Sequence, residues 1–161
     1  MVNAHAALGD WAAVDAELAA LLGSGPEPVT AARLLADCLN WAAARAAARG
    51  EADEAERHLE HAAQVLAPRL HLPSTRLKRD LGRARVAALL HRQGEIERLA
   101  DEWLPHLVPP ASTKPRLAQA ELALELGGAL PDRDARREAL LAATLYWLRR
   151  EQVATSPRLA W

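Results

Sequence analysis

The feature that most constrains this chain is a predicted helical hairpin between Ala36 and Pro68, with its bend at Gly50. The stretch before the bend is dense in alanine, and small side chains let two helix backbones approach closely. After the bend, apolar residues recur at a spacing that one helix face can bury, namely Ala55, Leu59, Ala62 and Leu66. We therefore predict two antiparallel helices packed tightly against each other.

The rest of the sequence favours the same kind of structure. Alanine, leucine, arginine and glutamate are strong helix formers and are frequent among the 161 residues, while phenylalanine is absent. No segment alternates apolar and polar residues as a half-buried strand does. The predicted fold class is all-α, with about seven or eight helices. We place them in a single domain over residues 1–150, followed by a tail over residues 151–161.

Glycine, proline and capping residues mark where the individual helices begin and end. The predicted bends lie at Gly9, Gly50, Gly94 and Gly127-Gly128. Ser74 or Thr75 is the expected N-cap of one helix, and Asp132 that of the last. The helices expected between these signals are Ala4–Leu8, Trp11–Leu22, Thr30–Arg49, a helix after Gly50 to Ala67, Arg76–Gln93, Glu95–Leu104, Leu117–Leu126 and a helix after Asp132 to Arg150.

Three of the bends are followed by residues at the same distances of +5, +9 and +12. Successive bends are 41 and 44 residues apart. A helical hairpin that recurs in this way is typical of a solenoid, in which stacked hairpins bury faces that no single hairpin could bury. The residues concerned are Val14, Leu18 and Leu21 after Gly9, Ala55, Leu59 and Ala62 after Gly50, and Leu99, Trp103 and His106 after Gly94.

In these features the chain resembles the tetratricopeptide repeat family. The match is best over residues 36–68 and weakest over residues 80–110, where Pro105 interrupts the helix and His106 replaces a small residue. In that family the first helix of each hairpin is complete, but here only the last turns of the first one, Ala4–Leu8, are expected. We therefore expect that the chain opens with a half repeat or is cut from a longer protein. The resemblance rests on Gly9-Asp10-Trp11, Gly50-Glu51, Ala55, Ala62, Pro26 and Pro68.

The resemblance implies a short α-solenoid whose outgoing helices line a concave groove that binds peptides or protein surfaces. By that register the groove residues are Asp37, Asn40, Trp41, Arg85, His91 and Arg92. Fixed guanidinium groups beside an amide suit an acidic side chain or a C-terminal carboxylate. The alternatives are that the arginines pair with carboxylates of a neighbouring helix, and that Trp41 belongs to the core. A homodimer, formed through an apolar outer ridge, is a further expectation.

Charge and targeting signals narrow the classes of partner. The formal net charge is -1, so we expect no nucleic-acid binding. Residues 1–64 carry ten acidic and four basic residues, whereas residues 69–98 carry eight basic and three acidic ones. This basic stretch is either a solvated face or a docking surface for an acidic partner. The N-terminus lacks the pattern of a signal peptide and no apolar run is long enough to span a membrane, so the predicted location is the cytoplasm, away from membranes.

The sequence contains no convincing catalytic motif, and no cofactor is expected. Glu54, His58 and His61 share one helical stripe and could hold a metal ion, although a solvated flank explains them as well. The lone Cys38 lies among apolar residues and is expected to be an inert buried thiol. Leu159 and Trp161 in the tail could dock into a groove. The predicted function is a binding adaptor; the alternatives are a regulatory segment of a larger multidomain protein and a small enzyme or metalloprotein.

Overall fold

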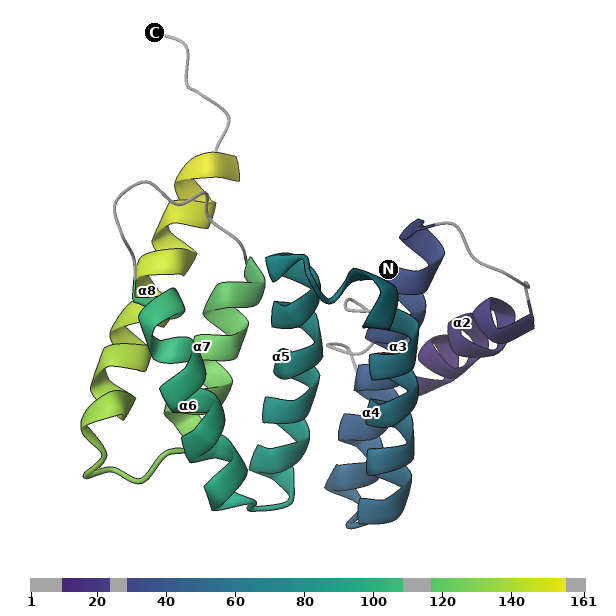
Figure 1. Cartoon of the computed structure of the whole chain (residues 1–161), viewed down its shortest axis with the longest axis horizontal. Coiled ribbons are helices and arrows are strands. Elements are labelled where there is room, and N and C mark those ends of the chain that lie inside the picture. The colour runs from purple at the N-terminus through teal and green to yellow at the C-terminus, as the bar shows by residue number, and fades with distance from the viewer. Residues whose placement is uncertain (1–9, 24–28, 109–116, 156–161) are drawn as a thin grey trace, which may run out of the picture. The chain divides into compact units, whose positions relative to one another are not determined.

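A computed structural model describes residues 10–23, 29–108 and 117–155. Every regular element within these residues is a helix, which confirms the predicted all-α fold class (Figure 1). Contacts divide the chain into two compact units, Met1–Leu90 and His91–Trp161. The first unit contains α2 (Trp11–Gly23), α3 (Val29–Ala48), α4 (Ala52–Leu66), the 3-10 helix η1 (Ala67–Arg69) and α5 (Pro73–Leu89). The second contains α6 (Gln93–Leu107), α7 (Leu117–Ala129) and α8 (Ala135–Thr155).

Helix α3 is the centre of the first unit, because it packs against α2, α4 and α5 (Figure 1). Alanine dominates these contacts, and the missing side-chain bulk brings the helix backbones together. Against α4 and α5 it buries a cluster consisting of Ala43, Ala46, Ala47, Ala55 and Val86. Against α2 and α4 it buries Leu35, Leu39 and Ala62, with Leu18, Leu21 and Val65 at the edge. The predicted hairpin of α3 and α4 is therefore present.

The turn between α3 and α4 has the geometry that requires glycine. Gly50 has a φ of 78°, in the left-handed region. Its amide donates to the carbonyl of Ala47 at 2.9 Å, and the amide of Glu51 donates to that of Ala46 at 3.0 Å. These two bonds are the Schellman pattern, which satisfies carbonyls left over at the end of a helix. The predicted bend at Gly50 is confirmed.

In the second unit α6, α7 and α8 pack against one another. Trp147 is buried, and its indole Nε1 donates a hydrogen bond of 2.8 Å to the carbonyl of Leu107 at the end of α6. Arg136, in the first turn of α8, bonds both Asp101 on α6 at 2.6 Å and Asp134 in the preceding loop at 2.5 Å. The N-terminal end of α8 is thus joined to α6 by the Arg136–Asp101 ion pair, and its middle by the hydrogen bond of Trp147.

Two predicted bends of the second unit are wrong. The chain turns at Leu90–Arg92 rather than at Gly94, and His91 takes the left-handed conformation with a φ of 53°. Gly94 lies inside the first turn of α6. Gly127 and Gly128 were expected in a loop but belong to α7. At Gly127 the side chains of Leu140 and Leu141 on α8 pack closely, 3.1–3.2 Å from where a Cβ would lie.

Three helix boundaries also differ from the predictions. Helix α5 begins at Pro73 with Leu72 as its N-cap, so neither Ser74 nor Thr75 caps it. Proline suits this position because the first helical amide has no partner within the helix. Helix α6 continues through Pro105 to Leu107 instead of ending at Leu104. Helix α8 begins at Ala135, and the carboxylate that accepts a backbone amide of its first turn is that of Asp134, whereas Asp132 bonds only the side chain of Arg137.

The expected helix end Ala4–Leu8 and the tail residues Leu159 and Trp161 lie outside the described residues. Helix α8 itself extends to Thr155, into the segment assigned to the tail. Among the described residues, no helix combines the length and apolar character that a membrane span needs.

Candidate binding surface of the first unit

Two tryptophans and two arginines of the first unit meet across α2, α3 and α5; we call them the Trp–Arg cluster. The guanidinium of Arg85 on α5 lies 4.3 Å from the ring centroid of Trp41 on α3. The ring of Trp41 lies 6.3 Å, centroid to centroid, from that of Trp11 on α2. Arg45 on α3 stands over Trp11, 5.6 Å from its centroid. Each arginine thus faces an indole, an arrangement favoured by the negative face of the ring.

The Trp–Arg cluster packs against buried residues and is itself only partly buried. Trp11 and Trp41 are half-buried and pack against buried Val14 and Cys38. Arg45 forms an ion pair of 2.8 Å with Asp15 on α2, and both side chains are substantially exposed. Arginine and tryptophan are the residue types most often found as energetic anchors of protein interfaces. The cluster therefore has the composition and the partial exposure of a recognition surface.

Helices α3 and α5 run parallel beside this cluster. Arg33 donates a hydrogen bond of 3.2 Å to Ser74, and Lys78 pairs with Asp37 at 2.5 Å; in both pairs the partners are 41 residues apart. Further along both helices Trp41 meets Arg85. The pairs advance in the same direction on each helix, which is what parallel neighbours require. Their separation equals the spacing between Gly9 and Gly50 in the sequence.

Asn40, one of the residues expected in the groove, has a packing role instead. Only 5% of it is exposed, and its Nδ2 donates to the carbonyl of Lys78 at 3.2 Å. Its Oδ1 is buried without a hydrogen-bond partner and lies against Gly82. Asn40 joins α3 to α5, so we leave it out of the candidate surface. Asp37 stays at the edge of that surface, although its charge is paired with Lys78.

The remaining predicted groove residues belong to the second unit. Arg92 lies 4.0 Å from Glu95, three residues further along α6. His91 is exposed and forms the left-handed turn before α6. The alternative interpretation, that both arginines pair with carboxylates of a neighbouring helix, is not what Arg92 shows, because its partner Glu95 lies only three residues further along the chain. Arg85 contacts the ring of Trp41.

The metal hypothesis gains no geometric support from the described residues. His58 Nε2 lies 3.7 Å from the carboxylate of Glu54. No group of three potential ligands converges anywhere in the described parts of the chain. Cys38 is buried as expected, and burial, reinforced by the carboxylates of Glu17 and Asp37, raises the pKa of its thiol to about 11. A thiol of that pKa is a poor nucleophile at neutral pH.

Sequence reasoning did not include Trp11, Arg45 or Lys78 in the surface. Trp11 lies on an apolar stripe of its helix, which favours a place in the core, but the structure leaves it half-exposed. Arg45 follows Trp41 by four residues, so one helix face carries both side chains. That spacing was a usable signal for Arg45. No sequence pattern pointed to the contact between the tilted rings of Trp11 and Trp41.

We compared the chain with protein-family models, curated proteins and solved structures, and none of these comparisons returned a match.

Proposed function

We propose that the first unit is a binding module that captures an acidic peptide or protein segment on the Trp–Arg cluster. The observation that carries this proposal is the stacking of Arg85 on half-exposed Trp41, beside Trp11 and Arg45. In this proposal α3 and α5 are the outgoing helices of successive hairpins in a tetratricopeptide-like solenoid. Their parallel course and the 41-residue separation of their paired residues support that interpretation.

The chemistry of the cluster favours a carboxylate next to an apolar or aromatic side chain. When a guanidinium stacks on an indole, the ring covers its flat face, whereas carboxylates are bound by the N–H groups at its edge. The stacked geometry also holds the arginine in place, so less side-chain freedom is lost when a ligand binds. The indoles of Trp11 and Trp41 offer flat surface for the apolar part of the ligand.

A peptide array tests the proposal. Octapeptides with acidic, neutral and basic side chains, each with a free or an amidated C-terminus, are probed with the full chain. We expect retention of acidic peptides. If only peptides with a free C-terminus bind, the recognised group is the chain carboxylate; if both forms bind, it is an acidic side chain. Retention of basic peptides alone, or of no peptide, overturns the proposal.

Two charge reversals on α5 make the test specific to the cluster. Arg85→Glu places a carboxylate against Trp41, and we expect the dissociation constant of the selected peptide to rise at least about tenfold. Arg83→Glu changes the charge equally but lies two residues away, roughly on the opposite side of the helix. It should leave binding within about twofold. Equal effects of both variants would mean that general charge, and not the cluster, attracts the peptide.

A further inference from the structure

The second unit exposes an apolar surface along α7 and α8, which we call the leucine face. The exposed fractions are 51% for Leu117, 53% for Leu124, 57% for Leu145 and 37% for Leu148. Leu117 and Leu124 are seven residues apart on α7, and Leu145 and Leu148 are three apart on α8, so each pair shares a helix face. Half-buried Leu141 lies one turn before Leu145 on the same face.

The two halves of this face meet across the α7–α8 contact. The side chain of Leu141 packs on Gly127, where an added Cβ would lie 3.1 Å from Leu141 Cδ2. Gly127 follows Leu124 by three residues, so the exposed leucines of both helices flank this point. Trp147, which bonds α6, is buried and lies on another side of α8. Helix α6 therefore packs away from the leucine face.

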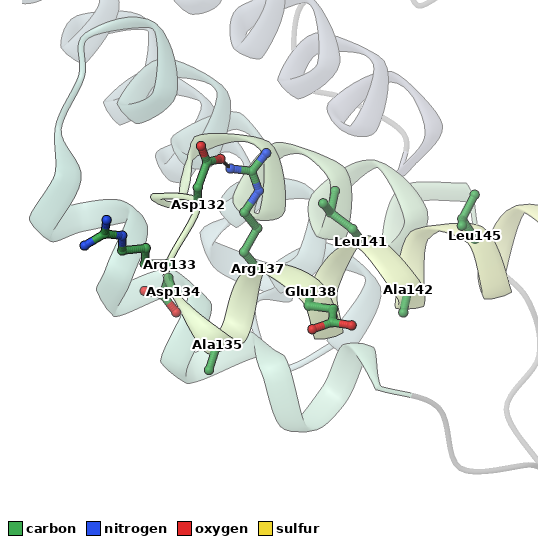
Figure 2. A pocket seen from close by; sticks show the side chains of 9 residues that line it. All are labelled: Asp132, Arg133, Asp134, Ala135, Arg137, Glu138, Leu141, Ala142 and Leu145. Atoms are coloured by element: carbon green, nitrogen blue, oxygen red, sulfur yellow. Dashed lines mark hydrogen bonds and ion pairs between the residues drawn. The ribbon is translucent and has the colours of Figure 1, made fainter.

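A hollow of about 500 Å³ lies at the start of α8 (Figure 2). Its walls are the loop before α8, including the ion pair of Asp132 with Arg137, and the first three turns of the helix. Leu141 and Leu145 project from the same side of α8 at this hollow, while Glu138 and Ala142 line it from another side (Figure 2). The hollow is open and partly apolar, so it can accept a side chain from outside.

Opposite charges stand at the two ends of the leucine face. Glu138 precedes Leu141 by about one turn, and Arg149 follows Leu145 by about one turn. Both side chains are exposed. Helix geometry places both on the same flank of the leucine stripe, since eleven residues correspond to about three turns. A surface with a negative and a positive end is complementary to itself when one copy is reversed.

We propose that the leucine face binds a second copy of this chain, with the two α8 helices antiparallel about a two-fold axis. When Leu141 of one copy lies opposite Leu145 of the second copy, Glu138 lies level with Leu148 of the second copy. Arg149 of the second copy is then only one residue, about 1.5 Å along the axis, from Glu138. The two-fold axis makes this ion pair twice, as an isologous interface requires.

The exposed leucines and the opposite charges of the leucine face both fit a second copy of this chain better than a different partner. The leucines supply apolar area that is unfavourable in water. Leu148 of the second copy reaches the hollow beside Glu138, so a leucine fills it. An acidic partner would meet Glu138 unfavourably, and a basic partner would meet Arg149 unfavourably, whereas a reversed copy satisfies both charges.

Sedimentation equilibrium of the full chain tests the proposal. We expect the average mass to rise with concentration from 17.5 kDa towards twice that value. Leu145→Glu should raise the dimer dissociation constant by about a hundredfold or more, because each dimer contains the substitution twice. Leu89→Glu changes a leucine of the first unit that is 43% exposed, and it should leave the dissociation constant unchanged.

Charge reversals test the register. Glu138→Arg alone and Arg149→Glu alone should each weaken the homodimer about tenfold or more, since like charges then face each other. An equimolar mixture of these two variants should dimerise about as well as the natural chain, because opposite charges face each other again in the mixed dimer. Circular dichroism of each variant checks that the helical content of the chain is unchanged.

Three results overturn the proposal. They are a monomer at every concentration, a dimer that is insensitive to Leu145→Glu, and a mixture of the two charge variants that dimerises no better than either alone. The mixture is informative even if one variant is slightly less stable, because a general loss of structure cannot be rescued by adding the other chain.

Discussion

Asn40 on α3 occupies the space that a side chain at Gly82 on α5 would need. A Cβ placed on Gly82 would lie 2.5 Å from Asn40 Cγ and 2.9 Å from its Nδ2. Both residues are buried, and the Asn40 amide bonds the backbone of α5 one turn before Gly82. The parallel pairing of α3 and α5 therefore depends on a residue without a side chain.

Gly82→Ala should destabilise the protein although alanine is the better helix former. The helix preference contributes up to about 1 kcal/mol in favour of alanine, whereas forced displacement of packed atoms costs about 1–3 kcal/mol. We expect a net loss of about 1–2 kcal/mol in the free energy of unfolding, measured by urea denaturation. Gly128→Ala on α7 is the matched control: nothing lies within 4 Å of its Cβ position, so a gain of about 0.5 kcal/mol is expected.

The double variant Asn40→Ala/Gly82→Ala identifies the cause. If Asn40 is the obstacle, shortening it makes room, and the double variant loses less stability than the two single variants together. Simple addition of the two losses would indicate that Asn40 and Gly82 act independently.

Trp147→Phe should destabilise the second unit. The buried indole of Trp147 donates to the carbonyl of Leu107, which lies at the C-terminus of α6 and has no amide in the next turn of the helix. Phenylalanine retains most of the apolar surface but leaves that carbonyl buried without the indole. We expect a loss of about 2 kcal/mol in the free energy of unfolding. A loss below about 0.5 kcal/mol would show that water or a shifted backbone replaces the indole.

Asp134 should make the stability of the second unit depend on acid pH. Its hydrogen bonds with the Arg136 side chain and amide lower the pKa of Asp134 from 3.8 to about 2. A carboxyl whose pKa is lower in the folded state stabilises the fold above about pH 4, and that contribution disappears as the pH falls towards 2.

Asp134→Asn tests this dependence cleanly, because asparagine can still accept the Arg136 amide at the start of α8. Urea midpoints of the natural chain and the variant should therefore differ at pH 5 and converge as the pH approaches 2. A constant difference over that range would contradict the role of the Asp134 charge.

Sequence reasoning predicted the elements whose cause is local. Gly50 was identifiable as a bend because only glycine adopts its conformation readily, and α4 because its apolar residues repeat at helical spacing. The turn at His91 was missed because a non-glycine residue in the left-handed region leaves no sequence signal. Gly127 was misassigned to a loop because tertiary packing, and not a turn, explains the glycine at this position. The side chains of Leu140 and Leu141 fill the space beside it.

The candidate site was predictable only as far as the helix register of the tetratricopeptide repeat family could be transferred to this sequence. That register placed Trp41 and Arg85 on facing helices, and the structure brings them into contact. The same register could not distinguish buried Asn40 from half-buried Asp37 and Trp41, since burial depends on how closely α5 approaches at Gly82. Trp11 joins the cluster because α2 packs on α3, and no pattern in the sequence determines that angle.

The most direct test of the Trp–Arg cluster follows the indole N–H resonances while an acidic peptide from the array is added. Each tryptophan gives one such signal in a 1H–15N spectrum, and single Trp→Phe variants assign them. We predict that the signals of Trp11 and Trp41 shift with peptide concentration, while that of buried Trp147 stays in place. If the peptide binds but the signals of Trp11 and Trp41 do not shift, the proposed surface is contradicted.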